Sequence, residues 1–343
     1  MDSPEARSDQ LGGWLWRVGG TAVSNGAAKG VLLVGTLLTV PLVLDSIGNE
    51  GLGVWLTLVT VTSVLGFADL GLGNGIMTAV AGATSSRSEE KIRSTVAAGY
   101  ALLVTVAIVM LVVLGAGMAF VDLPSLFGLE SPDADLSRGI TAFLVLFLVG
   151  LPLSVTEKLQ WGLQRGYVAG VWALAAAITT IVGVVAAALL DLGLTGLAIA
   201  YAGTPILFGL CNTVWSFAWW RPDLRPRPAH VRRSQMRELW TIGALYFVLQ
   251  LSAAFAFAAD NFIVAMTLGP ERVPDLAVPA RLFGLVTFAL GLLLRPMWPE
   301  YTRAISLGRV SWVERTTIRS LVLATAVAAL ASAGLLLFGS ALT

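Results

Sequence analysis

The sequence predicts an all-α polytopic membrane protein with about nine transmembrane helices. Of its 343 residues, 56% are hydrophobic and 13% are charged, and the mean hydropathy is +0.81. A helix needs roughly 20 apolar residues to cross the hydrocarbon core, where each backbone polar group must be satisfied internally. Runs that meet this requirement lie at residues 19–44, 53–80, 95–120, 138–163, 168–190, 195–219, 238–267, 277–298 and 317–338.

Charged residues between these runs alternate in sign along the chain. Arg87, Lys91 and Arg93 share one gap, and arginines also fill the gaps at 221–237 and 303–319. The remaining gaps are acidic, and their residues are Asp45, Glu50, Asp122, Glu130, Asp133, Asp135, Asp191, Glu271 and Asp275. Because basic segments resist translocation, the N-terminus and the basic gaps are expected on the cytoplasmic side.

The first six runs form the predicted N-terminal lobe, residues 1–220. Glycines separated by four positions occur at 26–30, 71–75 and 162–166, and this spacing lets helix backbones approach closely. The glycines around position 71 are also expected to loosen the second helix near its cytoplasmic end.

Residues 221–237 form a predicted cytoplasmic linker rich in arginine and proline. Pro222, Pro226 and Pro228 prevent a continuous helix in this segment. The linker separates the first lobe from a partial second lobe, residues 238–343, with three predicted helices. A weak repeat of a helix and its basic gap, in the same orientation, indicates two lobes in parallel. The chain is therefore either truncated or a shortened version of a two-lobed protein.

Composition argues against an enzyme and against a cofactor or a metal. The chain has one cysteine, Cys211, and one histidine, His230, so these residue types cannot assemble a metal site. The glycines at 71, 73 and 75 are too closely spaced for a dinucleotide fingerprint. No nucleic-acid partner is expected, and the partners predicted are membrane lipids.

Lys29 is the sharpest candidate for a functional charge within the membrane. It lies twelve residues after Arg17, which places it roughly 18 Å along the first helix and near the midplane. Ionisable groups at that depth usually face a cavity or a partner. Lys29 could line an aqueous cavity that attracts an anion, or could form a structural pair with Asp69 or Asp260.

Carboxylates and amides at membrane depth allow two roles each. Asp69 and Asn74 flank the glycines of the second helix, where Asp69 is favoured as a cap of freed backbone NH groups over ion coupling. Asp260 and Asn261 lie near the outer end of the seventh helix, and a cavity role and a helix-pairing role are equally supported.

Two arginines, Arg281 and Arg295, fall on the eighth predicted helix. Their spacing of fourteen residues is close to four full turns, so both project from nearly the same face. They could hold a phosphate that moves along a groove, or each could extend to its nearer membrane surface. Glu157, Lys158 and Gln160 are predicted to form a solvated cluster near the cytoplasmic end of the fourth helix.

Several short motifs resemble polysaccharide flippases of the multidrug/oligosaccharidyl-lipid/polysaccharide exporter superfamily. They are DNFIVAMTLG at 260–269, VPARL at 278–282 and RPMWPEY at 295–301, with GLGVW at 51–55 and DLG at 69–71. Their order and spacing agree with that family over most of the chain. Superfamily members generally have twelve or more helices, so the shorter chain departs from the pattern.

The resemblance implies a two-lobed, alternating-access transporter in the bacterial inner membrane. Its cargo would be an undecaprenyl-diphosphate-linked oligosaccharide, moved to the outer leaflet for surface polysaccharide biosynthesis. Lys29, Arg281 and Arg295 are the candidates for the basic cavity that receives the diphosphate, and Asp69, Glu157 and Asp260 are candidates for ion coupling. Polysaccharide-assembly enzymes or a second copy would be its protein partners.

Two other interpretations remain open. A multidrug exporter of the same fold would favour buried carboxylates and an aromatic cavity, and Lys29 argues against it. A transport-inactive, truncated membrane protein is the third, favoured by the missing helices.

Overall fold

The computed structural model describes residues 4–118, 120, 134–268, 286, 290–291, 294 and 297–338. This part of the chain is built from helices, and six of its segments are long and apolar enough to cross a membrane. They are Gly19–Thr62, Glu89–Gly117, Ala134–Gly162, Gly166–Leu189, Gly193–Trp220 and Arg233–Phe255. The all-α membrane fold class is therefore confirmed.

The first two predicted membrane passes meet without a loop. Helix α1 (Pro4–Leu65) is interrupted at Gly48, whose φ of 70° and ψ of −178° lie outside the helical region. Glycine adopts this conformation at little steric cost because it has no Cβ atom. A single residue therefore separates the two passes.

The second predicted helix, 53–80, is not continuous, and this part of the prediction was wrong. Helix α1 ends at Leu65, residues 66–71 form turns, and α2 (Leu72–Ser85) starts afresh. Leu70 and Gly71 both have left-handed backbone conformations, with φ of 52° and 74°. A right-handed helix cannot pass through two such residues, so the glycines here break the helix.

The third to sixth predicted passes correspond to helices in the structure. The fourth and sixth each contain short segments of other helical type, η2 within the fourth, and η3 and η4 within the sixth. The elements are α3 (Glu89–Gly117), α4 (Ala134–Gly150), η2 (Leu151–Leu153), α5 (Ser154–Gly162), α6 (Gly166–Leu189), α7 (Gly193–Ala198), η3 (Ile199–Gly203), α8 (Thr204–Trp215) and η4 (Ser216–Trp220). We call α1–α8 the N-terminal bundle.

The predicted linker is non-helical over a shorter range than 221–237. Two short 3-10 turns, η5 (Pro222–Leu224) and η6 (Pro228–His230), precede α9 (Arg233–Leu268). Helix α9 begins early because no helix-breaking residue follows Pro228 in this segment. Helices α11 (Trp298–Ser306) and α12 (Val310–Phe338) follow, and most of the predicted eighth helix, 277–298, lies outside the described residues.

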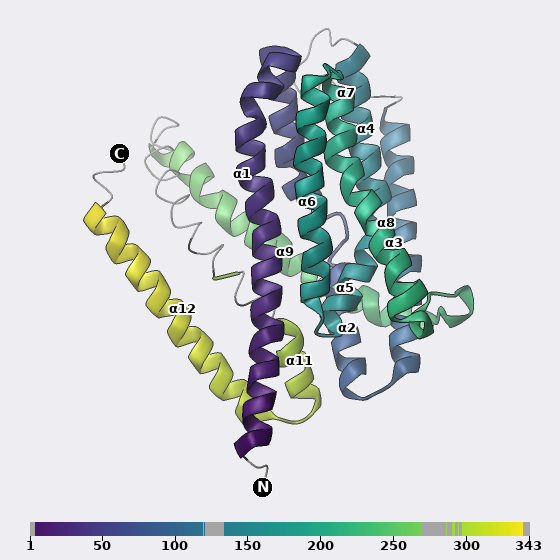
Figure 1. Ribbon diagram of the computed structural model, residues 1–343, viewed down its shortest axis with the longest axis vertical. Helices are drawn as coiled ribbons and strands as arrows, with labels where there is room; N and C mark the ends of the chain where they lie inside the picture. The colour runs from purple at the N-terminus through teal and green to yellow at the C-terminus, as the bar shows by residue number, and fades with distance from the viewer. Residues whose placement is uncertain are drawn as a thin grey trace.

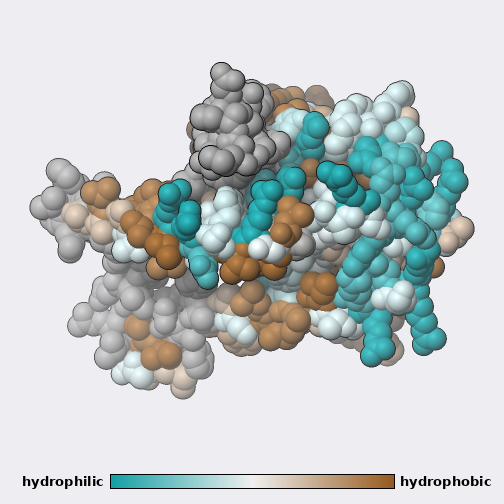
Figure 2. All heavy atoms as spheres, turned by 90° about the horizontal axis from the view of Figure 1, so that it is seen from below, coloured by the Kyte–Doolittle hydropathy of each residue, from teal (hydrophilic) through white to brown (hydrophobic). Residues whose placement is uncertain are grey.

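The helices of the N-terminal bundle stand side by side, whereas α9 and α12 lean away from it (Figure 1). The lower end of the molecule in this view carries the turns at 86–88, 163–165 and 307–309 and the segment 221–232. We call it the basic end because its arginines include Arg87, Arg165, Arg221, Arg225, Arg227, Arg232 and Arg309. Figure 2 views the molecule from this side and shows hydrophilic side chains gathered there. The opposite, acidic end carries Asp45, Glu50 and Asp191.

Two large hydrophobic clusters and a smaller one, formed by Ala68, Ala107, Leu148 and Leu151, make up the core of the described residues. The cluster nearer the basic end joins α2, α3, α5 and α9 through Ile76, Val96, Leu159 and Leu239. The second large cluster joins α1, α4 and α6 to α7 through residues that include Val43, Phe143, Val184 and Leu197. Helix α9 thus takes part in the core at the basic end.

Candidate functional site

Asp69 holds the break in the second membrane pass. Its carboxylate accepts hydrogen bonds from the Gly71 NH at 2.9 Å and from the Gly73 NH at 3.1 Å. The first NH groups of a helix have no acceptor within the helix, and a carboxylate there also interacts favourably with the helix dipole. The predicted capping role of Asp69 is therefore present. Asn74 lies half-buried in the first turn of α2.

The break lies where α2 crosses α9 at a contact between glycines. A methyl group on Gly71 would overlap the backbone oxygen of Gly243 and lie 2.7 Å from the Phe247 nitrogen. A methyl group on Gly75 would lie 3.4 Å from the Gly243 nitrogen. The close helix approach expected from the 71–75 spacing is thus found, and α9 is the neighbouring helix.

Polar contacts extend this crossing along α2 and α9. The hydroxyl groups of Thr78 and Tyr246 share a hydrogen bond of 3.0 Å. The Tyr246 ring also lies 5.8 Å from the ring of Trp298, measured between centroids. Tyr246 therefore links α9 to α2 and to the start of α11.

Ion pairs at the basic end attach the 221–238 segment to the start of α3. Lys91 lies 3.2 Å from Glu238, Arg221 lies 3.6 Å from Glu89, and Arg232 pairs with Glu90. Leu224 is fully buried beside them in the cluster of the basic end. The predicted linker is therefore docked on α3.

Arg221 also forms a two-point contact with Asp223. The guanidinium donates to both carboxylate oxygens, with distances between 2.6 and 3.1 Å. This hydrogen bonding lowers the pKa of Asp223 from its ordinary value of 3.8 and raises the pKa of Arg221. Each charge stabilises the other, so the contact persists at neutral pH.

Helix α9 leaves the N-terminal bundle as it runs toward the acidic end. Leu239 is fully buried, whereas Val248 and Phe255 are 60% and 68% exposed. Helix α9 contacts α2 and α3, and α11 contacts α2. Among the described residues, these contacts of α9 and α11 with α2 and α3 therefore lie at the basic end (Figure 1).

The predicted cationic residues fall in different parts of the chain. Lys29 lies on α1 with its side chain exposed, beyond the contact in which the Asn25 amide donates to the Gly166 oxygen at 3.3 Å. Arg281 and Arg295 lie outside the described residues. The backbone of α9 includes Asp260 and Asn261, whose side chains are also outside the description.

The predicted solvated cluster at the end of the fourth pass is only partly correct. Glu157 and Lys158 are partly exposed and form an ion pair of 3.5 Å. Gln160 is fully buried, so the prediction that it is solvated was wrong. Its amide donates to Asn212 at 2.6 Å and to Ser216 at 3.1 Å, and this network joins α5 to α8 and η4.

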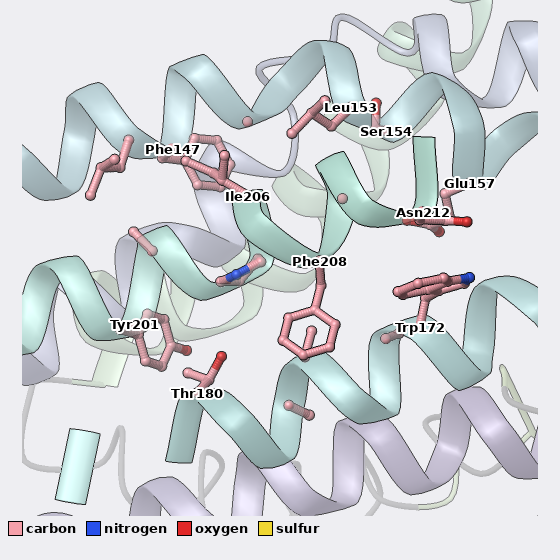
Figure 3. Close-up of a pocket in the computed structure, with 18 of the residues that line it drawn as sticks. Phe147, Leu153, Ser154, Glu157, Trp172, Thr180, Tyr201, Ile206, Phe208 and Asn212 are labelled. Carbon is pink, nitrogen blue, oxygen red and sulfur yellow. The ribbon is translucent and has the colours of Figure 1, made fainter. Parts of the chain in front are cut away.

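A cavity of about 480 Å³ lies within the N-terminal bundle, between α1, α4–α5, α6 and α8. Figure 3 shows Glu157, Ser154 and Asn212 near one end of it, and Thr180 and Tyr201 near the other. The wall between them is apolar and aromatic, with Phe147, Leu153, Trp172, Ile206 and Phe208 among its residues. Of the predicted site residues, Glu157 lines this cavity.

Sequence patterns did not single out Trp172, Thr180, Tyr201 or Phe208. Each lies within a long apolar run, where aromatic and small residues are equally typical of lipid-facing and buried positions. Among the described residues, no group of three or more His, Cys, Asp or Glu side chains is arranged to hold a metal ion.

No family model and no curated protein sequence matches this chain. Its fold occurs in solved transporter structures. A MATE protein in the bent conformation has a TM-score of 0.74 at 17% identity, over 94% of this chain and 72% of that one. An outward-facing multidrug resistance MATE family transporter of the MOP superfamily has a TM-score of 0.73 at 16% identity, over 95% of this chain and 73% of that one.

A MOP superfamily transporter from Pyrococcus furiosus, described by the reverse polarity of its binding pocket, has a TM-score of 0.71. It is 17% identical, over 94% of this chain and 72% of that one. At these identities the likeness shows the fold. The chain is a multi-pass membrane protein with the fold of MATE transporters of the MOP superfamily.

Proposed function

We propose that this chain, with its MATE transporter fold, moves an undecaprenyl-diphosphate-linked oligosaccharide across the bacterial inner membrane by alternating access. The observation that carries the proposal is the position of Lys29, which is exposed on α1 within the membrane-spanning segment Gly19–Thr62. A lysine at that depth is costly unless it faces a polar path or a partner. A diphosphate is an anionic cargo that a lysine at that depth attracts.

The junction between α2 and α9 supports the alternating-access part of the proposal. The broken second pass, its Asp69 cap and the Gly71–Gly243 contact lie where the bundle meets the later helices. Alternating access can proceed by a rigid-body movement of one lobe against the other. The close crossing of α2 and α9 would act as the pivot of that movement, and the ion pairs on α3 would hold the basic end closed.

The orientation follows from the charge asymmetry between the two ends. The basic end would face the cytoplasm, because basic segments resist translocation. In this orientation, the contacts between the bundle and the later helices at the basic end would close the cytoplasmic side. Arg281 and Arg295 remain candidates for additional phosphate contacts along the eighth helix.

The test is mass spectrometry of undecaprenyl-linked sugars in a strain that lacks the gene. We expect a completed lipid-linked oligosaccharide to accumulate, and the wild-type chain to reverse this. Lys29→Arg should retain most of the reversal, whereas Lys29→Ala should lose it at equal membrane abundance. Leu33→Ala, one turn further along the exposed side of α1, is the matched control and should behave as wild type.

Two results would contradict the proposal. If Lys29→Ala reverses the accumulation of lipid-linked sugar as fully as wild type does, Lys29 has no role in transport. No accumulation of lipid-linked sugar in the deletion strain would remove the cargo assignment itself.

The fold supports a second candidate, a multidrug exporter, because one of the similar solved structures is a multidrug resistance MATE family transporter. A deletion strain that becomes sensitive to cationic dyes, with normal lipid-linked sugars, would support this alternative.

A further inference from the structure

We propose that the cavity of the N-terminal bundle is a binding site for one uncharged amphiphile taken up from the bilayer. The ligand would have an apolar body and a single hydrogen-bonding group. This site lies inside the bundle, between α1, α4–α5, α6 and α8, and Lys29 is not among the described residues that line it. It therefore adds a ligand to the proposed function and does not depend on it.

The size and lining of the cavity match a small-molecule site. Pockets that hold drug-sized ligands measure roughly 300–1,000 Å³ and are mainly apolar, with a few polar groups that orient the ligand. This cavity measures about 480 Å³. Rings of Phe147, Trp172 and Phe208 face it from α4, α6 and α8 (Figure 3).

Thr180 supplies the polar group that a ligand would engage. Its side chain lines the cavity and is 1% exposed, and its hydroxyl has no hydrogen-bond partner among the described residues. Many other threonines in the helices donate to a carbonyl oxygen three or four residues earlier, as Thr39, Thr84, Thr95, Thr141 and Thr204 do. A buried hydroxyl without a partner is unfavourable, so a ligand with a polar atom near Thr180 would be stabilised.

The charges of the lining favour an uncharged ligand. Glu157 is the charged residue among the described lining residues, and Lys158 already pairs with it. The Asn212 side chain beside it is satisfied by Gln160 and Ser216. An ion in this apolar cavity would lose its hydration without gaining an uncompensated counter-charge.

The faces around the cavity indicate uptake from the hydrocarbon region. On α6, Ala173, Ala176 and Ala177 line the cavity and leave space opposite Phe208 of α8. The outer faces of the same helices are apolar, and Val171 and Leu207 are 60% and 57% exposed. An amphiphile dissolved in the bilayer can therefore reach the α6–α8 side without crossing a polar surface.

The experiment uses Trp172 as a reporter within the cavity. Bromo-undecanol, a terminal alcohol with bromine at the far end of its chain, is titrated against the full chain in detergent, and tryptophan fluorescence is recorded. Bromine quenches tryptophan at close range, so we expect a saturable loss of signal in wild type. Trp172→Phe should reduce that saturable component and thereby assign it to the cavity, and the part that remains would come from Trp215, whose ring lies 6.3 Å from that of Trp172.

Substitutions then test the two features of the site. Thr180→Val keeps the shape but removes the hydroxyl, and should weaken binding by about fivefold, as expected for one neutral hydrogen bond. Thr179→Val is the matched control, because Thr179 is exposed on the outer face, and should bind as wild type. Ala176→Phe should fill the cavity and abolish saturable quenching.

Three outcomes would overturn the proposal. They are equal affinity of wild type and Thr180→Val, saturable quenching whose amplitude is unchanged in Trp172→Phe, and tighter binding of the trimethylammonium analogue than of the alcohol. None of these readings depends on lipid-linked sugars, so failure here leaves the flippase proposal untouched.

Discussion

Gly71 and Gly243 approach so closely that the backbone oxygen of Gly243 occupies the space where a side chain on Gly71 would lie. Gly71 also has a φ of 74°, so its glycine is required by conformation as well as by space. The contact joins the broken second pass to the first helix after the linker. Its rigidity should therefore govern both stability and movement at the basic end.

Gly71→Ala is expected to destabilise the protein by about 2–4 kcal/mol, because a left-handed alanine and a steric overlap act together. Thermal unfolding of the purified protein in detergent measures this. Gly82→Ala is the matched control on the same helix, since a methyl group there meets nothing within 4 Å. Similar unfolding temperatures for the two variants would contradict the role of the crossing.

Asp69→Ala should cost about 1 kcal/mol of stability through loss of the helix cap. Asp69→Asn should cost less, because its amide oxygen can still accept one of the two NH groups. For both variants, thermal unfolding measures the stability, and the lipid-linked sugar assay measures the transport activity. A stable Asp69→Asn variant that is inactive in the assay would instead assign ion coupling to this carboxylate.

Asn212→Ala is expected to destabilise the bundle by about 1–3 kcal/mol, since it leaves the buried Gln160 amide without its closest partner. The present hydrogen bond from Gln160 to Asn212 is 2.6 Å long. Cys211→Ala, at the neighbouring exposed position on α8, provides the control. In denaturant titrations, Asn212→Ala should unfold at a clearly lower denaturant concentration than Cys211→Ala. Coincident unfolding curves would contradict the structural role of this network.

The Arg221–Asp223 contact should loosen in acid. The pKa of Asp223 is below its ordinary value of 3.8 in the folded protein, so its stabilising contribution is complete above that value. The contribution is lost as pH falls through the lowered folded pKa. Amide hydrogen exchange in the 221–232 segment should therefore be constant from about pH 5 to 8 and should rise below about pH 4, after correction for the intrinsic exchange rate.

Asp223→Asn tests the cause of that change. The variant should show faster exchange in the 221–232 segment at neutral pH and a weaker acid dependence. An acid response as large as that of wild type would place the responsible group elsewhere.

Sequence reasoning succeeded where the deciding interactions are local. Asp69 caps NH groups two and four residues away, so its role followed from the adjacent glycines alone. Long apolar runs likewise gave the membrane fold class, because length and composition decide whether a helix spans the bilayer. The boundary errors at 53–80 and 221–237 arose from backbone conformation and from proline positions within those ranges.

The parts that were missed depend on contacts between distant segments. Gln160 is buried because Asn212 and Ser216, more than fifty residues later, receive its amide. The cavity depends on the spacing of four passes, and its aromatic residues resemble any others in an apolar run. Neither the burial of Gln160 nor the position of the cavity can be predicted from a short window of sequence.

The single-residue turn at Gly48 has a consequence for biosynthesis. Two membrane passes separated by one residue form a helical hairpin that must enter the bilayer as a unit. In the proposed orientation, with the basic end in the cytoplasm, Asp45 and Glu50 are the charged groups near the tip that have to be translocated. Since the connection is one residue long, we expect the two passes to be inserted together and not one after the other.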